Sequence, residues 1–102
     1  MDHFSITTKA KLWEYAAIKG AWHFVTLNKT AQKWVEQVRP KMRRGFGSIP
    51  VIVTIGSSTW KTSLFPDKMR GYVMPVKSKI LKVQKLQEGD FVTLILKRDR
   101  AR

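Results

Sequence analysis

Cysteine is absent from the 102 residues of this chain, which excludes a disulfide framework and a thiolate metal site. Histidine is scarce, and His3 and His23 lack the close spacing of a histidine metal site. The seven acidic residues form no pattern typical of general acid–base catalysis. Ser57, Ser58 and Ser63 lie in an expected turn and strand, and the sequence specifies no catalytic base for them. These absences predict a protein that is not an enzyme and that carries no metal or cofactor.

Long apolar runs are also absent. The most apolar stretch, residues 49–55, is far shorter than the roughly 20 residues that a membrane-spanning helix needs. The chain begins Met-Asp-His-Phe and has no basic region followed by an apolar run, so we expect no signal peptide. Together with the lack of cysteine, which fits a reducing compartment, this predicts a cytoplasmic protein without a membrane role.

Negative charge is in short supply, and positive charge is abundant. Twenty Lys and Arg against seven Asp and Glu give a net charge of +13 and a pI near 10.6. Such a chain attracts polyanions, among them nucleic acid, anionic lipid and acidic protein. The alternative is that the charge serves only solubility. Hydrophobic residues make up 43% of the chain, which is enough for the core of one domain. We expect this domain to cover residues 1–97, followed by a frayed basic tail at 98–102.

The residue pattern predicts six strands, at residues 4–16, 22–27, 51–55, 59–65, 71–76 and 91–97. Alternation of side-chain character indicates the first, and a nearly continuous β-branched run indicates the strand at 51–55. In the first, the alternation slips at Leu12 and Trp13, which predicts a bulge or bend there. In the last, both faces are mostly apolar, so we expect it to lie in the interior of a barrel.

Two helices are expected between the strands. Asn28 is the predicted cap of the first, in which Ala31, Trp34, Val35 and Val38 form an apolar stripe; Pro40 is expected to end it. Ser78 is the predicted cap of the second. Residues 24–29 and 72–77 both lead from a strand into a helix, which indicates two strand–helix halves related by a pseudo-two-fold axis.

Several motifs together resemble the bacterial "domain of unknown function 1905" family. They are Gly-Ser-Ile-Pro-Val at 47–51, Thr-Ile-Gly at 54–56, Thr-Trp-Lys-Thr-Ser-Leu-Phe-Pro at 59–66, Tyr72 with Pro75-Val76-Lys77, and Glu-Gly-Asp at 88–90. The resemblance extends from about Phe4 to Leu96. It implies a mainly β fold with two short helices, namely a small closed double-split β-barrel, the architecture of AbrB-like transcription factors. Because both strand–helix halves of the barrel occur in one chain, we expect the chain to close its own barrel as a monomer.

The strongest functional prediction is binding of nucleic acid or another polyanion. A small barrel with basic loops and exposed aromatic side chains can hold phosphates and stack bases. Phe46 and Trp60 are candidates for stacking, although the alternation of Trp60 with Thr62 and Leu64 also fits core packing. The loop at 40–48 is a further candidate for contact with the polyanion, or else it only connects the helix to the next strand. The candidate phosphate contacts are Lys41, Arg43, Arg44, Lys61, Arg70, Lys77 and Lys79.

A second hypothesis is a small-ligand or protein-interaction domain without a nucleic-acid role. It predicts scattered cations and an apolar pocket between the barrel and the helix at 28–39. The first hypothesis instead predicts that the cations gather on one face and that binding weakens steeply with salt.

Overall fold

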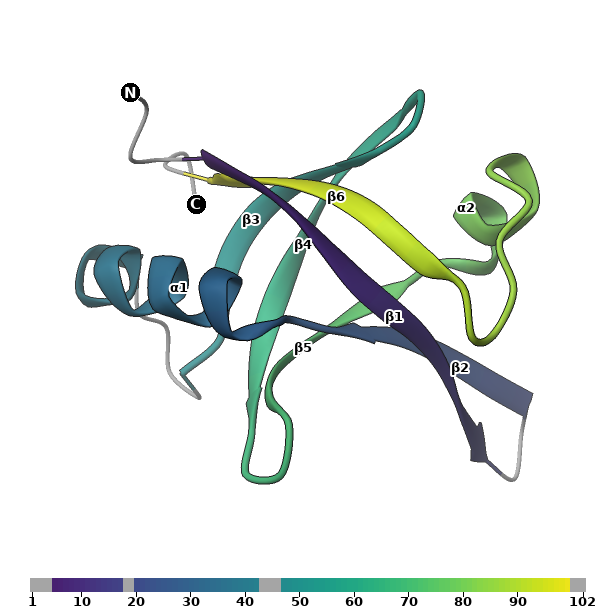
Figure 1. Ribbon diagram of the computed structural model, residues 1–102, viewed down its shortest axis with the longest axis horizontal. Helices are drawn as coiled ribbons and strands as arrows, with labels where there is room; N and C mark the ends of the chain where they lie inside the picture. The colour runs from purple at the N-terminus through teal and green to yellow at the C-terminus, as the bar shows by residue number, and fades with distance from the viewer. Residues whose placement is uncertain (1–4, 18–19, 43–46, 100–102) are drawn as a thin grey trace.

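A computed structural model describes residues 5–17, 20–42 and 47–99 of the chain (Figure 1). The fold is mainly β, with six strands that close an antiparallel barrel and two short helices. In chain order the elements are β1 (Ser5–Ala17), β2 (Gly20–Thr26), α1 (Lys29–Met42), β3 (Ile49–Ile55), β4 (Ser58–Asp67), β5 (Gly71–Val76), α2 (Ser78–Val83) and β6 (Phe91–Arg98).

The long strand β1 closes the barrel by pairing with two neighbours in turn. Its first half, from Ser5 to Lys11, pairs with β6, and its second half, from Lys11 to Ala17, pairs with β2. The order around the barrel is β1-β2-β5-β4-β3-β6, and β6 returns to β1. Beyond Lys11, β1 and β2 therefore continue as a hairpin that leaves β6 behind (Figure 1). Strand β2 stays paired with β5 from His23 to Thr26, so only the end of the hairpin, from Tyr15 and Trp22 onward, is two-stranded. We call this segment, from Lys11 to Thr26, the β1–β2 arm.

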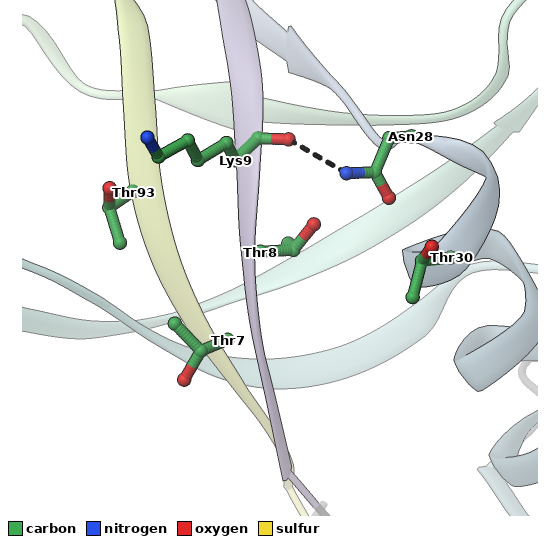
Figure 2. A pocket seen from close by; sticks show the side chains of 6 residues that line it. All are labelled: Thr7, Thr8, Lys9, Asn28, Thr30 and Thr93. Atoms are coloured by element: carbon green, nitrogen blue, oxygen red, sulfur yellow. Dashed lines mark hydrogen bonds between the residues drawn. The ribbon is translucent and has the colours of Figure 1, made fainter.

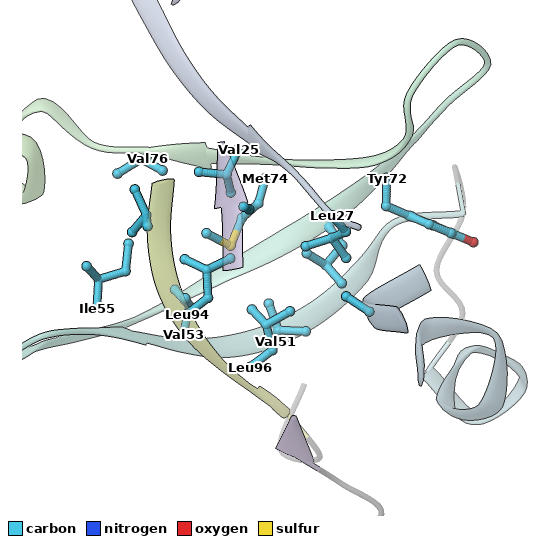
Figure 3. Packing of buried hydrophobic residues seen from close by; sticks show 14 of the residues in the cluster. Val25, Leu27, Val51, Val53, Ile55, Tyr72, Met74, Val76, Leu94 and Leu96 are labelled. Atoms are coloured by element: carbon cyan, nitrogen blue, oxygen red, sulfur yellow. The ribbon is translucent and has the colours of Figure 1, made fainter. Parts of the chain in front are cut away.

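The barrel interior is filled with aliphatic side chains from every strand. Figure 3 shows Val25, Val53, Met74 and Leu94 converging from four different strands. Each fully buried aliphatic side chain of this kind contributes about 1.5–3 kcal/mol relative to the exposed state. The fully buried large side chains also include Leu12, Leu27, Ile49, Leu64, Val51 and Leu96. The strands therefore hold their positions through one continuous core.

Strand β6 alternates strictly between the interior and the outer surface. Val92, Leu94 and Leu96 are buried, whereas Phe91 and Ile95 are 73% and 44% exposed. The prediction that the strand lies wholly in the interior is wrong, because every strand of a barrel has one outer face. The apolar side chains on that outer face belong to the surface.

Asn28 caps α1 as predicted. Its Oδ1 accepts a hydrogen bond from the Ala31 N–H at 2.8 Å, which satisfies one of the free amides of the first turn. The predicted stripe faces the barrel, with Trp34, Val35 and Val38 all buried. The helix runs to Met42, past Pro40, so the predicted stop is wrong. Proline removes one backbone donor, but its own φ is compatible with a helix.

The N-cap of the second helix lies one residue before the predicted cap, Ser78. Lys77 is the N-cap, without a side-chain hydrogen bond, and Ser78 is the first helical residue. Ile80 and Leu81 are buried against the core. After the helix, the Gln84 amide donates to the hydroxyls of Ser57 and Ser58 at 3.1 and 2.9 Å. These bonds attach α2 to the β3–β4 hairpin.

The bulge expected in the first strand near Leu12 is found instead opposite Leu12, at Gly89 and Asp90 just before β6. The Leu12 N–H donates to the Asp90 carbonyl at 2.9 Å, and its carbonyl accepts from the Gly89 N–H at 2.8 Å. Gly89 and Asp90 thus both lie opposite Leu12, which is the pattern of a β-bulge. Gly89 has a φ of +94°, a positive value that glycine tolerates. Strand β1 itself pairs one-to-one with β2 from Lys11 onward.

The packed barrel includes residues beyond 97. Arg98 belongs to β6 and is 6% exposed, and Asp99 is 2% exposed. The Asp99 N–H donates to the Pro50 carbonyl at 3.2 Å. The expected boundary therefore moves by two residues, and the rest of the predicted tail, at 100–102, lies outside the described residues.

Candidate nucleic-acid interface

The predicted phosphate contacts occupy several separate positions. Lys61 lies on β4, where it is exposed and pairs with Ile52 of β3. Arg70 precedes β5, whereas Lys77 and Lys79 follow it, so about 20 Å of strand separates the two ends. Lys41 lies within α1, but its side chain lies outside the described residues, as do Arg43, Arg44 and Phe46.

Trp60 points toward the barrel interior. It is partly buried and packs against the core, on the same face of β4 as the fully buried Leu64. Its indole Nε1–H is buried and has no hydrogen-bond partner. This placement corresponds to the core-packing alternative that the sequence left open.

The acidic side chains of the described residues are largely engaged within the protein. Glu36 accepts from the Tyr72 hydroxyl at 3.2 Å, and Asp90 accepts from the Gln87 N–H at 2.9 Å. Glu88 accepts from the Glu14 N–H at 3.4 Å. In these three hydrogen bonds the donor is a neutral group, either a hydroxyl or a backbone N–H. The lysines, in contrast, are exposed: Lys9, Lys11, Lys29, Lys33, Lys61, Lys68, Lys77, Lys79, Lys82, Lys85 and Lys97.

Asp67 shapes the turn between β4 and β5. Its Oδ1 accepts from the backbone N–H groups of Met69 and Arg70 at 2.8 and 2.9 Å. These two hydrogen bonds, from Arg70 and then Met69, lower the pKa of the Asp67 carboxyl, with a further contribution from the charge of Arg70. The Arg70 guanidinium lies 3.8 Å from Asp67 Oδ2. The turn thereby fixes the direction of the Arg70 side chain.

Arg70 is directed onto the outer face of the β1–β2 arm. Its guanidinium carbon lies 4.2 Å from the centre of the Trp13 ring, which is a cation–π contact. Trp13 in turn stacks on Phe24, with ring centres 5.0 Å apart and planes inclined by 25°. The Trp13 Nε1–H donates to the Thr26 hydroxyl at 2.8 Å. Arg70 and Trp13 are therefore held in defined orientations.

Two further aromatic residues continue this face toward the end of the arm. Tyr15 and Trp22 are direct partners across β1 and β2, as are Trp13 and Phe24. Side chains two residues apart on a strand share a face, so the four rings lie on one side of the arm. Tyr15 is 58% exposed and Trp22 is 60% exposed. We call Trp13, Tyr15, Trp22 and Phe24 the aromatic face.

Lys9 and Lys11 extend the same side of β1 back along the barrel. Both are exposed, whereas Thr8, Ala10 and Leu12 between and beside them are buried. The Lys11 position is flanked by Phe91 of β6, another exposed aromatic residue. Along β1 the outer side chains thus change from basic to aromatic.

A depression of about 460 Å³ that is lined by polar residues lies beside Lys9, between β1 and the start of α1. Figure 2 shows its lining, in which the Asn28 amide donates to the Lys9 carbonyl at 3.2 Å and the Lys9 side chain extends over β6. Three of the other lining side chains carry hydroxyl groups at the surface: Thr7, Thr30 and Thr93. The depression therefore offers hydrogen-bonding groups next to a cation.

A hollow lies between α1 and Tyr72 of β5, where the second hypothesis predicts an apolar pocket. This depression of about 380 Å³ is lined by Lys29, Gln32, Lys33, Glu36 and Tyr72. These side chains carry polar or charged groups, but most of the surface that they present to the hollow is apolar.

Sequence reasoning missed the aromatic face, although its signal was present. The regular alternation that buries Ala10 and Leu12 places Trp13 and Tyr15 on the outer side if it is simply continued. The predicted bulge in β1 hid this consequence. Trp22 and Phe24, also two residues apart, then follow from the hairpin pairing.

Within residues 5–17, 20–42 and 47–99, no group of three or more His, Asp or Glu side chains could hold a metal ion. In the same ranges, no helix has the length and apolar character to span a membrane.

The fold and surface define a small basic β-barrel with an interior filled by its own side chains. A family model described as "Domain of unknown function (DUF1905)" matches residues 9–96. The chain belongs to this family, as its motifs indicated. No curated protein and no solved structure matches the chain.

Proposed function

We propose that this chain is a non-enzymatic module that binds nucleic acid through the basic outer surface of its barrel. The observation that carries the proposal is the contrast between its charged groups. Lysines lie exposed on the strands, helices and turns, while Glu36, Asp67, Glu88 and Asp90 accept hydrogen bonds within the protein. With a net charge of +13, the outer surface attracts a phosphate backbone over a long range.

Within this proposal, contact with phosphates centres on the outer side of β1. Lys9 and Lys11 are exposed there, and Lys9 lines the hydroxyl-rich depression. Arg70 approaches the same side from the β4–β5 turn. Contacts of this type position a nucleic acid without reading its sequence, so we expect little sequence specificity.

The proposal also includes the double-split connectivity implied by the resemblance. It is supported by the strand order, because exchanging β1, β2 and β3 with β4, β5 and β6 leaves the order of neighbours unchanged. In both halves the second strand leads into a helix, and these two strands, β2 and β5, are antiparallel neighbours. A pseudo-two-fold axis between β2 and β5 would produce this arrangement.

The test is fluorescence anisotropy with labelled single-stranded and duplex oligonucleotides, from roughly 50 to 200 mM salt. We expect micromolar or tighter binding at the lowest salt, with a steep loss as salt rises because condensed counterions are released on binding. Replacing both Lys9 and Lys11 with Gln should weaken binding to every oligonucleotide and reduce the salt slope by about one to two.

The matched control changes Lys82 and Lys85 to Gln, which removes the same charge near α2. It should retain most of the affinity. An equal loss in both variants would assign the effect to net charge alone. Absence of binding at the lowest salt would refute the proposed function.

A further inference from the structure

The β1–β2 arm exposes aromatic side chains that the barrel core does not use. Tyr15 and Trp22 are more than half exposed, although the fold buries Leu12 and Val25 on the opposite side of the same arm. A contiguous exposed group of large aromatic residues is typical of a binding surface. The surface therefore needs a partner that covers flat rings next to cations.

We propose that the aromatic face is a stacking platform for unpaired bases, so that the chain binds single-stranded nucleic acid in preference to duplex. This inference rests on the proposed function and names its substrate. A basic groove beside aromatic rings is the usual means of holding a single strand, because bases stack on the rings while cations follow the phosphates.

The geometry of the arm suits stacking. Neighbouring strands are about 5 Å apart, and alternate residues of one strand are about 7 Å apart, so the four rings form a compact grid. The inner pair is rigid, because Trp13 stacks on Phe24 and donates a hydrogen bond to Thr26. Tyr15 and Trp22 form the outer, accessible pair. Rigid rings lose little conformational entropy when a base is added.

Positive charge at the Trp13 end of the grid favours nucleic acid over an apolar partner. Lys11 precedes Trp13 on the outer side of β1, and the Arg70 guanidinium covers the Trp13 ring at 4.2 Å. A guanidinium plane can itself stack on a base and also pair with a phosphate. A strand lying along β1 would meet Lys9 and Lys11 with its phosphates and the aromatic face with its bases.

The same geometry explains the expected preference for single strands. In a duplex the faces of the bases are stacked on each other, and only their edges are accessible in the grooves. The aromatic face can therefore engage a duplex only after a base has left its stack, which costs a few kcal/mol. An unpaired strand requires no such step.

The experiment measures the affinity for a labelled 12-nucleotide single strand and for a hairpin duplex at one salt concentration, roughly 50 mM. The full chain is compared with the double variant Tyr15→Leu/Trp22→Leu, which keeps apolar side chains and removes the rings. We expect the variant to lose about 5- to 100-fold in single-strand affinity. Its duplex affinity should change less than about twofold, because phosphate contacts carry that binding.

Two controls separate stacking from other effects. The double variant Tyr15→Phe/Trp22→Phe keeps a ring at each position and should retain single-strand affinity within about threefold. Phe65→Leu removes a ring that is 43% exposed on β4, outside the arm, and should leave the affinity unchanged. Because Tyr15 and Trp22 are exposed, circular dichroism and the thermal midpoint should confirm that all variants fold.

The outcomes distinguish this inference from the proposed function. Oligonucleotide binding that is unaffected by the Leu variant overturns the inference and leaves the proposed function in place. No binding to either oligonucleotide overturns both. Self-association, or binding to anionic lipid vesicles, that requires Tyr15 and Trp22 in the absence of oligonucleotide binding assigns the face to a second copy or to lipid, and also overturns the inference.

Discussion

At the scale of single residues, Asn28 connects a helix to the barrel. Its Oδ1 accepts from the Ala31 N–H at 2.8 Å, while its Nδ2 donates to the Lys9 carbonyl at 3.2 Å. One side chain thus caps α1 and ties it to β1. The second bond could not be anticipated from local sequence, because it joins residues in different elements.

Changing Asn28 to Ala should destabilise the protein by about 0.5–2 kcal/mol, because an uncapped amide remains in the first turn. Urea denaturation followed by circular dichroism measures this difference. Asn28→Ser keeps a capping oxygen and loses only the bond to Lys9, so it should recover most of the stability. Equal destabilisation by both changes would show that the bond to Lys9, and not the cap, is the main contribution.

At the scale of elements, the β4–β5 turn determines where Arg70 lies. Asp67 binds the turn amides and stands beside the Arg70 guanidinium, which in turn covers Trp13. A turn at one end of the barrel thereby completes the aromatic face on the β1–β2 arm. The two segments are distant in sequence and adjacent in the fold.

The pKa of Asp67 is lowered in the folded state from its ordinary value of 3.8, so its ionised form stabilises the fold. That contribution is fully present above pH 3.8 and is lost as the pH falls through the lower, folded pKa. Asp67→Asn should therefore lower the thermal midpoint at pH 7. The difference from the unmodified protein should shrink as the pH is lowered toward about 2.

The comparison of thermal midpoints at the two pH values is the measurement. Asp90→Asn is a suitable control, because Asp90 accepts one backbone N–H, from Gln87, whereas Asp67 accepts two and lies beside the Arg70 guanidinium. A midpoint difference for Asp67→Asn that stays constant with pH would contradict the assigned role of the carboxylate charge.

At the scale of the whole molecule, all six strands of the barrel come from one chain. Strand β6 pairs with both β1 and β3, so closure needs no strand from a second copy. We therefore predict that stability does not depend on protein concentration, since a fold completed within one chain has no association step.

Thermal midpoints at roughly 5 and 200 µM should agree within error, with light scattering giving the mass of one chain. An obligate dimer would instead show a midpoint that rises with concentration. Such a rise would mean that the barrel requires a partner copy for its stability.

Much of the fold follows from residue patterns. Local sequence predicts the alternation in the strands, the apolar stripe of α1 and the Asn28 cap, because each depends on residues close together in sequence. The strand motifs identified the family. The prediction at Pro40 was wrong because proline does not always end a helix: α1 continues to Met42, and the φ of proline is compatible with a helix.

The sequence by itself determined the strand and helix segments, the basic charge and the family, because these depend on composition and short-range periodicity. Only the tertiary structure decided which side chains are left outside. The partly buried position of Trp60 and the exposed positions of Tyr15 and Trp22 depend on how strands pair. Pairing also brings Arg70 onto Trp13. The candidate platform is therefore a product of barrel closure, since its rings and its cation come from separate strands and a turn.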